Sequence, residues 1–232
     1  MELQPLIFSL LSTIILGLSA FLIVIAGGLR PTDLDCVESI SSWSPASHVL
    51  RHEWKTFQND FKETSPYRGE PSPSLEAVWN SSLPEAPIKV SHLNLAQLKD
   101  EPSNFASHDS DGGALGHLEV FRNLACLNLL RQHTYRKDYD YSHLEAFNGQ
   151  ESSIMARLDG CVQRLRQILM CSGDTTPYLI ILTPERKQKE SPDFNTLHYC
   201  RDFDSVLSWT LENGIQTSVE LPPLYTLTDE LL

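Results

Sequence analysis

An uncharged apolar run from Leu6 to Gly27 constrains this chain more than any other feature. It consists mainly of Leu, Ile, Val, Phe and Ala, interrupted only by Ser, Thr and Gly. A helix of about 20 apolar residues is what the hydrocarbon core of a bilayer requires. A cleaved signal peptide normally has a basic segment before a shorter apolar run, and residues 1–5 contain no Lys or Arg. The sequence therefore predicts a short N-terminal tail and a single retained transmembrane helix over residues 6–27.

The composition of the whole chain is that of a folded, acidic protein. Hydrophobic residues make up 41% and charged residues 21% of the 232 residues, which is typical of globular rather than disordered chains. The formal net charge is −12. Binding to nucleic acid or docking on anionic lipid requires a basic patch, and the sequence contains none. We therefore expect no nucleic acid partner.

Changes in composition predict where the folded part begins and ends. Residues 28–74 are rich in Ser, Pro and charge and predict a stem, with a short helix near His48 to Phe61. On that helix His48 and His52 would lie one turn apart, either as metal ligands or on a solvated face. Residues 75–214 predict one compact domain, and residues 215–232 predict a loosely ordered tail.

Apolar periodicity predicts a mainly α domain with a few short strands, built around two antiparallel helices. The first helix is expected over residues 118–132 and the second from an N-cap at Ser152 or Ser153 to Cys171, stopped by Gly173. A short strand is expected at residues 87–91, a buried strand or extended segment at 176–184, and a last helix at 203–213. The expected buried faces are Val120, Phe121, Leu124, Leu127 and Leu130 on the first helix, and Ile154, Leu158, Cys161, Leu165, Ile168 and Leu169 on the second.

The two expected helices carry a sequence doublet. Residues 122–132 and 157–167 share an Arg, a small residue, a Cys, an aliphatic residue and Leu-Arg-Gln, and every equivalent pair is offset by 35 positions. A His-x-x-His-Cys spacing would place two imidazoles and a thiol on one helix face, a good arrangement for copper or another soft-to-borderline metal. Two such helices side by side would build a site of up to four His. This chain has the spacing without the imidazoles. The motif positions are Arg122, Ala125 and Cys126 in the first copy, and Arg157, Gly160 and Cys161 in the second.

Two features favour a lumenal, oxidising compartment for the domain. Asn80 begins the only Asn-x-Ser/Thr sequon and is a candidate glycosylation site. Five cysteines permit at most two intrachain disulfides. Cys126 and Cys161 could ligate a metal, pair with each other or pack as small apolar groups; the remaining cysteines are Cys36, Cys171 and Cys200.

These motifs resemble those of the UstYa-like family of fungal oxidases. The family carries segments close to Val-Phe-His-x-Leu-His-Cys-Leu-Asn-x-Leu-Arg and His-x-x-His-Cys-x-x-x-Leu-Arg-Gln, followed by Cys-x-x-Asp-Thr-Thr-Pro. The corresponding segments here are residues 120–131, 157–167 and 171–177. A closing family segment resembles residues 193–204, with Trp209 following. The resemblance runs in the same order over residues 75–214 and includes the N-terminal span.

The resemblance implies oxidative tailoring, such as macrocyclisation or hydroxylation, of a ribosomally derived peptide mycotoxin by a membrane protein that uses copper. All four motif His are replaced here. Arg brings a fixed positive charge that repels a cation, and Ala or Gly brings no donor. We therefore expect weak or absent copper binding. The pattern suits a non-catalytic partner of a His-bearing paralogue that handles the same peptide substrate, and it leaves open whether this chain is itself an oxidoreductase.

The resemblance also singles out residues in the C-terminal part of the domain. His198 lies in the family-like closing segment beside Cys200 and is the best remaining catalytic candidate; the others are His117, His133 and His143. If Cys126 and Cys161 have a structural role, Cys171 and Cys200 are the expected partners of a second disulfide.

Two other classes of function stay open. A type II glycosyltransferase would also have a span, a stem and Asp-x-Asp triplets that hold a divalent ion with a nucleotide sugar. No triplet follows a clear strand, however, and the chain lacks the alternating strands and helices of a nucleotide-binding fold. The second class is a membrane-tethered helical protein without catalysis. The triplets are residues 109–111, 138–140 and 202–204.

Overall fold

The computed structural model describes residues 3–28, 35, 39–59, 63–98, 105, 113–182, 190–219 and 221–226. The chain separates into two units, Met1–Trp43 and Ser44–Leu232. Cys36 and the Asp-x-Asp triplet at residues 109–111 lie outside the described residues.

The first unit contains helix α1, Leu3–Gly28. Its 26 residues span about 39 Å at 1.5 Å per residue, enough to cross a bilayer core of about 30 Å. The hydroxyls of Thr13 and Ser19 donate to the carbonyls of Leu10 and Ile15, each at 2.8 Å, so these polar groups are satisfied within the helix. Among the described helices, α1 alone is long and apolar enough to span a membrane, in agreement with the predicted helix.

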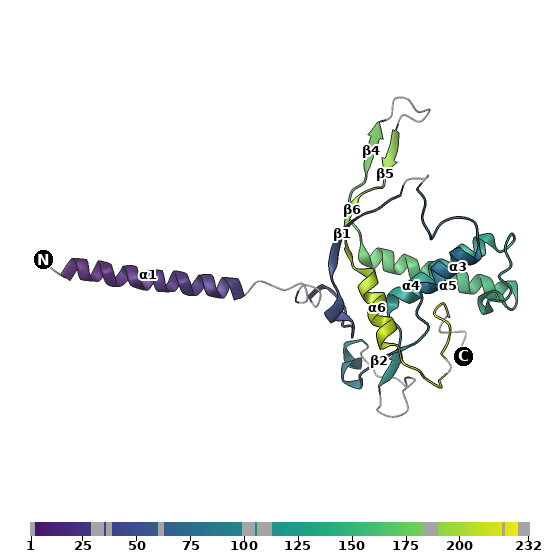
Figure 1. Ribbon diagram of the computed structural model, residues 1–232, viewed down its shortest axis with the longest axis horizontal. Helices are drawn as coiled ribbons and strands as arrows, with labels where there is room; N and C mark the ends of the chain where they lie inside the picture. Colours follow the sequence, from purple (N-terminus) through teal and green to yellow (C-terminus); the bar gives the residue numbers. More distant parts are fainter. Residues whose placement is uncertain are drawn as a thin grey trace. The chain divides into compact units, whose positions relative to one another are not determined.

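The second unit is organised around the antiparallel helices α4, Glu119–Tyr135, and α5, Glu151–Ser172 (Figure 1). Three contacts along the pair fix their direction. Arg164 forms an ion pair with Glu119, Cys126 is bonded to Cys161, and Arg136 donates to Glu151 at 3.1 Å. The predicted mainly α fold built around a helix pair is therefore confirmed.

The two helices bury different residues from those that periodicity predicted. On α4, Leu127 is exposed while Leu129 is buried, and on α5 both Ile168 and Leu169 are exposed. The prediction assumed that α4 buries one apolar face. The helix is instead contacted by several elements, so more than one face is buried. The residues buried on α4 are Phe121, Ala125, Cys126, Asn128, Leu129 and Gln132.

Helix α3, Pro73–Ser81, contacts α4 through a polar cluster. Ser72 caps α3 by accepting from the Leu75 N–H at 3.2 Å. The Glu76 carboxylate then accepts hydrogen bonds from Arg131 at 2.6 Å, Gln132 at 3.1 Å and the Tyr141 hydroxyl at 2.8 Å. Burial of Glu76 opposes its ionisation, but these three donors outweigh it and lower its pKa.

Helix α6, Phe203–Asn213, completes the helical part, and Phe203 meets Phe121 of α4 edge to face at 6.0 Å. Within the described ranges the strands form three antiparallel two-stranded ribbons. These pair β1, His52–Thr56, with β6, Leu197–Arg201; β2, Ile88–Val90, with β3, Ala114–Gly116; and β4, Leu179–Leu182, with β5, Glu190–Asp193. The 3-10 turns are η1, Ser47–Val49; η2, His92–Gln97; and η3, Glu145–Phe147.

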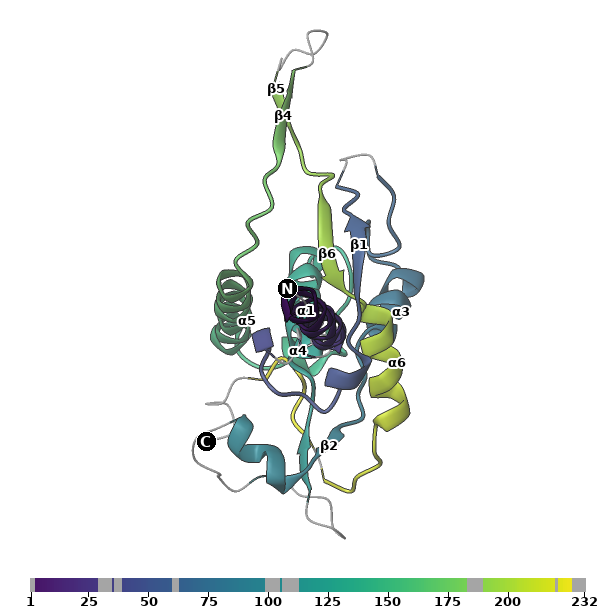
Figure 2. The same ribbon diagram turned by 90° about the vertical axis from the view of Figure 1, so that its left-hand side faces the viewer.

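One sequence prediction about these ribbons is wrong, and another is right about the strand but wrong about its burial. The helix expected near His48 to Phe61 is instead η1 followed by β1, which is held by β6, so residues expected in a stem pair with the domain. The segment expected as a buried strand or extended segment, residues 176–184, does contain a strand, β4, but it is not buried. It pairs with β5 in a hairpin that extends away from the α4–α5 pair in both views (Figures 1 and 2). Leu179 and Leu182 are 68% and 72% exposed. Their hydrophobicity indicated burial, but no described element covers them.

The ends of the helices follow local chemistry closely. Gly173 caps α5 with φ +48°, a left-handed conformation that glycine adopts without steric cost. The predicted stop at Gly173 is therefore confirmed. The predicted N-caps at Ser152 or Ser153 are wrong, since Gln150 precedes the helix without a side-chain cap. Helix α6 has the predicted bounds and ends before Gly214.

Candidate functional site

The doublet is joined at its centre by a buried disulfide. Cys126 and Cys161 are bonded, with their Cα atoms 4.9 Å apart, and the side chains are 2% and 0% exposed. Of the three roles that the sequence left open, the structure selects pairing. Neither sulfur is then available as a thiolate ligand for a metal.

The helix register separates the four positions where the family motifs place His. Cys126 pairs with Cys161, and three residues earlier on α4 Asn123 accepts from Arg164 at 3.1 Å, three residues later on α5. The two antiparallel helices therefore run past each other residue for residue. Measured along the helix axes, positions 125 and 160 are therefore offset by about 3 Å, whereas positions 122 and 157 are offset by about 12 Å. The motif therefore describes two ligand pairs placed symmetrically about the disulfide, and the expectation that two His-bearing helices would build a site of up to four His stays a prediction. These positions, called the ligand positions below, hold Arg122, Ala125, Arg157 and Gly160.

The two arginines at the ligand positions bind main-chain carbonyls. Arg122 donates to the carbonyl of Thr226 at 3.1 Å. Arg157 donates to the carbonyls of Ala146 at 3.2 Å and Asn148 at 3.1 Å. Each guanidinium therefore holds a non-helical segment against the helix pair. The two equivalent arginines of the doublet thus have the same structural role.

The residues present do not fit the copper that the family resemblance implies. Two guanidinium groups and two side chains without donors occupy the ligand positions, and both motif sulfurs are bonded to each other. No group of three or more His, Cys, Asp or Glu that could hold a metal occurs among the described residues. The other histidines are dispersed: burial lowers the pKa of His117, His133 stacks on Phe147 at 6.5 Å with its pKa lowered chiefly by burial, and His143 is exposed.

His198 lies in a polar array at the junction between α5 and the β1–β6 ribbon. Its Nδ1 is 3.0 Å from a carboxylate oxygen of Asp174, in the turn after α5, and its Nε2 is 2.7 Å from the hydroxyl of Thr196. The ring of Phe57 stacks on the imidazole at 3.9 Å. Sequence reasoning identified His198 but missed Asp174 and Thr196. The only signal for Asp174 was its place in the Asp-Thr-Thr-Pro segment.

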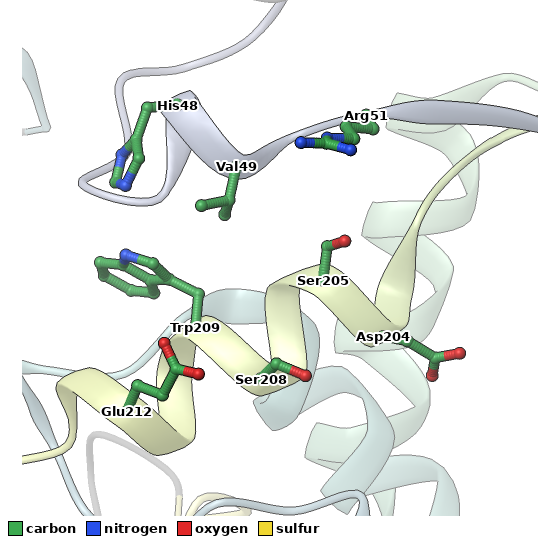
Figure 3. Close-up of a pocket in the computed structure, with 8 residues that line it drawn as sticks. All are labelled: His48, Val49, Arg51, Asp204, Ser205, Ser208, Trp209 and Glu212. Atoms are coloured by element: carbon green, nitrogen blue, oxygen red, sulfur yellow. The ribbon is translucent and has the colours of Figure 1, made fainter.

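A pocket of about 440 Å³ lies between η1 and α6 (Figure 3). His48 of η1 and Trp209 of α6 face each other across it, with ring centroids 6.1 Å apart. Basic groups lie on the η1 side and acidic groups on α6, so the pocket suits a small polar or zwitterionic group. The expectation that His48 and His52 share a helix is wrong, because His52 lies in β1 and stacks on Tyr199. The lining residues are His48, Val49, Arg51, Asp204, Ser205, Ser208, Trp209 and Glu212.

The second disulfide expected from the sequence is absent. Cys171, at the exposed end of α5, and Cys200, in β6, are both free thiols. Although the contact between Asp174 and His198 brings their two segments together, each cysteine lies outside that contact. Asn80 lies exposed in α3, where a glycan can be accommodated.

Aspartates of the two described Asp-x-Asp triplets serve local structure. Asp202 caps α6, accepting from the N–H groups of Asp204 at 3.1 Å and Ser205 at 3.3 Å. Asp140 accepts from the Ser142 N–H at 2.9 Å in a turn. Aspartates of these two triplets are engaged in local hydrogen bonds, so the triplets do not support a glycosyltransferase.

Comparison with known proteins gives consistent results. The family model described as "Mycotoxin biosynthesis protein UstYa" matches residues 4–213. The chain is 35% identical to the UstYa family oxidase phomYc of Diaporthe leptostromiformis, over 84% of this chain and 78% of that protein. It is 33% identical to the UstYa family oxidase phomYc' of the same organism, over 93% of this chain and 78% of that protein.

A more distant relative has a different name. It is the Transacylase cctO of Talaromyces islandicus, 27% identical over 79% of this chain and 64% of that protein. No solved structure matches the chain. The match to the family model over nearly the whole chain, together with relatives above 30% identity, settles the assignment. The chain belongs to the UstYa family of mycotoxin biosynthesis proteins.

Proposed function

We propose that this chain takes part in the oxidative tailoring of a fungal, ribosomally derived peptide mycotoxin, as the non-catalytic partner of a His-bearing paralogue. Two relatives that cover most of the chain are named as UstYa family oxidases, which supports the reaction class. Macrocyclisation and hydroxylation are the steps in which the pair would act. The paralogue would supply the oxidative centre, and this chain would supply surface for the paralogue and for the peptide.

The residues that occupy the ligand positions are the main support for this proposal. Arg122 and Arg157 are engaged with main-chain carbonyls, and Ala125 and Gly160 have no donor atoms. The surrounding helix pair and its disulfide are nevertheless complete. A scaffold that keeps its packing while its ligands are replaced by structural donors is the pattern expected of a partner subunit.

Exposed apolar side chains support a protein partner. All four residues of β4 are exposed, and Leu169 and Met170 near the end of α5 are each 69% exposed. The four consecutive aliphatic residues of β4 form an exposed apolar stretch, and such stretches are typical of surfaces covered by another protein. The acidic charge of the chain disfavours nucleic acid as the covering molecule.

The proposed location is a membrane of the secretory pathway. Helix α1 would be a single retained span, followed by the stem, with the domain in the lumen. The Cys126–Cys161 disulfide supports this location because such bonds persist in oxidising compartments. The exposed Asn80 sequon supports it as well, and a mobility shift on glycosidase treatment, lost in Asn80→Gln, would test the orientation.

Co-expression provides the decisive experiment. The full chain and a His-bearing paralogue are produced separately and together with the precursor peptide, and the oxidised product is measured by mass spectrometry. We expect product only from the pair, and copper only in the paralogue. Stoichiometric copper in this chain alone, with peptide oxidation, would overturn the non-catalytic assignment. Full product from the paralogue alone would overturn the partnership.

A further inference from the structure

The array formed by Asp174, His198 and Thr196 is not explained by the doublet or by the proposed partnership. Its residues come from two segments on either side of the β4–β5 hairpin, the turn after α5 and the β6 region. Two short contacts align them: carboxylate to imidazole at 3.0 Å, and imidazole to hydroxyl at 2.7 Å. A hydroxyl, a base and a group that orients the base are the parts of an activated nucleophile.

The direction of the hydrogen bonds follows from the chemistry of the groups. An ionised carboxylate only accepts, so Nδ1 of His198 carries the proton that faces Asp174. In the neutral imidazole, Nε2 then presents its lone pair to the Thr196 hydroxyl, which donates. Asp174 is held in the ionised form, since hydrogen bonds from Thr176 and then the proximity of His198 lower its pKa. The array therefore has the tautomer that a general base requires.

The surroundings hold the hydroxyl and the imidazole in place. The Phe57 N–H donates to the carbonyl of Thr196 at 3.0 Å, while the Phe57 ring covers one face of the imidazole. The next residue back is fixed as well, because Asn195 accepts from the Asn59 N–H at 2.6 Å. The His198 side chain is 13% exposed and that of Asp174 is 56% exposed, so solvent reaches the array at Asp174. These contacts hold the main chain at Thr196 and one face of the imidazole, which favours a preorganised site.

We propose that this array is an acyl-transfer site, in which Thr196 is the nucleophile, His198 its general base and Asp174 a positioning residue. The donor would be an activated ester or thioester, and the acceptor would be a hydroxyl or amine of a peptide. This activity is additional to the proposed partnership and does not depend on it.

The reaction balances without an oxidant or a metal. His198 Nε2 takes the Thr196 proton while Oγ1 bonds to the acyl carbon, the bond to the leaving group breaks, and the leaving group receives that proton from Nε2. In the second half, the acceptor gives its proton to Nε2 and bonds to the acyl carbon. Thr196 Oγ1 leaves and regains a proton from Nε2.

The test uses the full chain in detergent micelles with p-nitrophenyl acetate as the acyl donor. The exposed Cys171 thiol also reacts with activated esters, so all proteins carry Cys171→Ser and Cys200→Ser. Release of p-nitrophenolate gives the rate, and peptide mapping by mass spectrometry locates the acetyl group. We expect the acetyl group on Thr196.

Matched variants separate chemistry from structure. Thr196→Val keeps the shape and removes the hydroxyl, and we expect no adduct at residue 196, whereas Thr196→Ser should restore it. His198→Gln should lower the rate about a hundredfold or more, as loss of a general base does. Asp174→Asn should lower kcat about tenfold or more with KM unchanged, because the imidazole then adopts the wrong tautomer. His143→Gln, an exposed histidine outside the array, is the control and should leave the rate unchanged.

Three results would overturn the proposal. These are an absence of acetyl on Thr196, equal rates in Thr196→Val and the parent, or equal losses in His143→Gln and His198→Gln. A purely structural array would show lower thermal stability in the variants with kcat and adduct unchanged. Circular dichroism on every variant keeps unfolding apart from loss of chemistry.

Discussion

Removing the Cys126–Cys161 disulfide should cost this protein a large part of its stability. The bond closes a loop with a sequence separation of 35. In the chain-entropy description, cross-linking a loop of this length removes about 4 kcal/mol of conformational freedom from the unfolded chain. Since domains are stable by about 5–15 kcal/mol, the double variant Cys126→Ala/Cys161→Ala would lose roughly a third or more of the total.

The packing around the bond adds to this value. Both sulfurs are buried among Leu129, Ala146, Ile154 and Leu158, so the alanines leave small voids that cost about 1 kcal/mol. For a unit of this size, about 5 kcal/mol in total corresponds to a fall in Tm of roughly 10–20 °C. Alanine is preferred to serine because a buried hydroxyl without a partner would add its own penalty.

Thermal unfolding of the full chain in micelles, followed by circular dichroism, measures the loss. Either single alanine variant also breaks the bond, so the double variant should cost little more than each single one. Cys171→Ala, an exposed free thiol, is the control and should change stability by less than about 0.5 kcal/mol. A double variant that loses less than about 1 kcal/mol, or alkylation of Cys126 without prior reduction, would refute the reasoning.

Further predictions concern the polar groups around the helix pair. Burial first, and then the Glu76 carboxylate, raise the pKa of Tyr141 to about 12. The neutral phenol is thus favoured in the fold, and it should contribute about 2 kcal/mol to the free energy of unfolding. This contribution should be complete below pH 10 and be lost between pH 10 and 12. Melting curves recorded at increasing pH should show the loss in the parent and not in Tyr141→Phe. Arg157→Ala should cost about 1–2 kcal/mol and expose η3 to chymotrypsin, which cleaves after aromatic residues such as Phe147, because two carbonyls lose their donor. Restoring His at all four ligand positions should allow copper uptake, measured by metal analysis, at up to two ions per chain given the two separated pairs; no uptake would count against the motif alignment.

Local chemistry explains why much of the helical framework could be predicted from the sequence. The αL cap at Gly173 and the bounds of α6 depend on neighbouring residues only. The doublet also indicated the helix pair, and its offset is the sequence separation of the disulfide. The sequence could not choose among pairing, ligation and packing for Cys126 and Cys161, because that choice depends on the register between helices.

Non-local contacts account for what the sequence did not predict. Strand β1 is mostly polar and exposed, and it is a strand because β6 pairs with it, which no local pattern encodes. The same pairing brings Phe57 to His198 and so completes the array. Hydrophobicity predicted burial for β4 because it measures the cost of exposure but does not identify which surface covers the strand.

The position of the two sites on α5 makes their roles separable. Cys161 lies near the middle of the helix and Asp174 just beyond its end, so about 17 Å of helix lies between the disulfide and the turn that carries the carboxylate. Arg157, Cys161 and their partners stabilise the first half of α5, while the array depends on the β1–β6 ribbon. Loss of the disulfide should therefore lower Tm while acyl transfer at temperatures well below Tm is retained. Asp174→Asn should do the reverse, lowering acyl transfer with little change in Tm. If both variants altered both quantities in proportion, α5 would act as one cooperative element and the array would be part of the scaffold that the doublet builds.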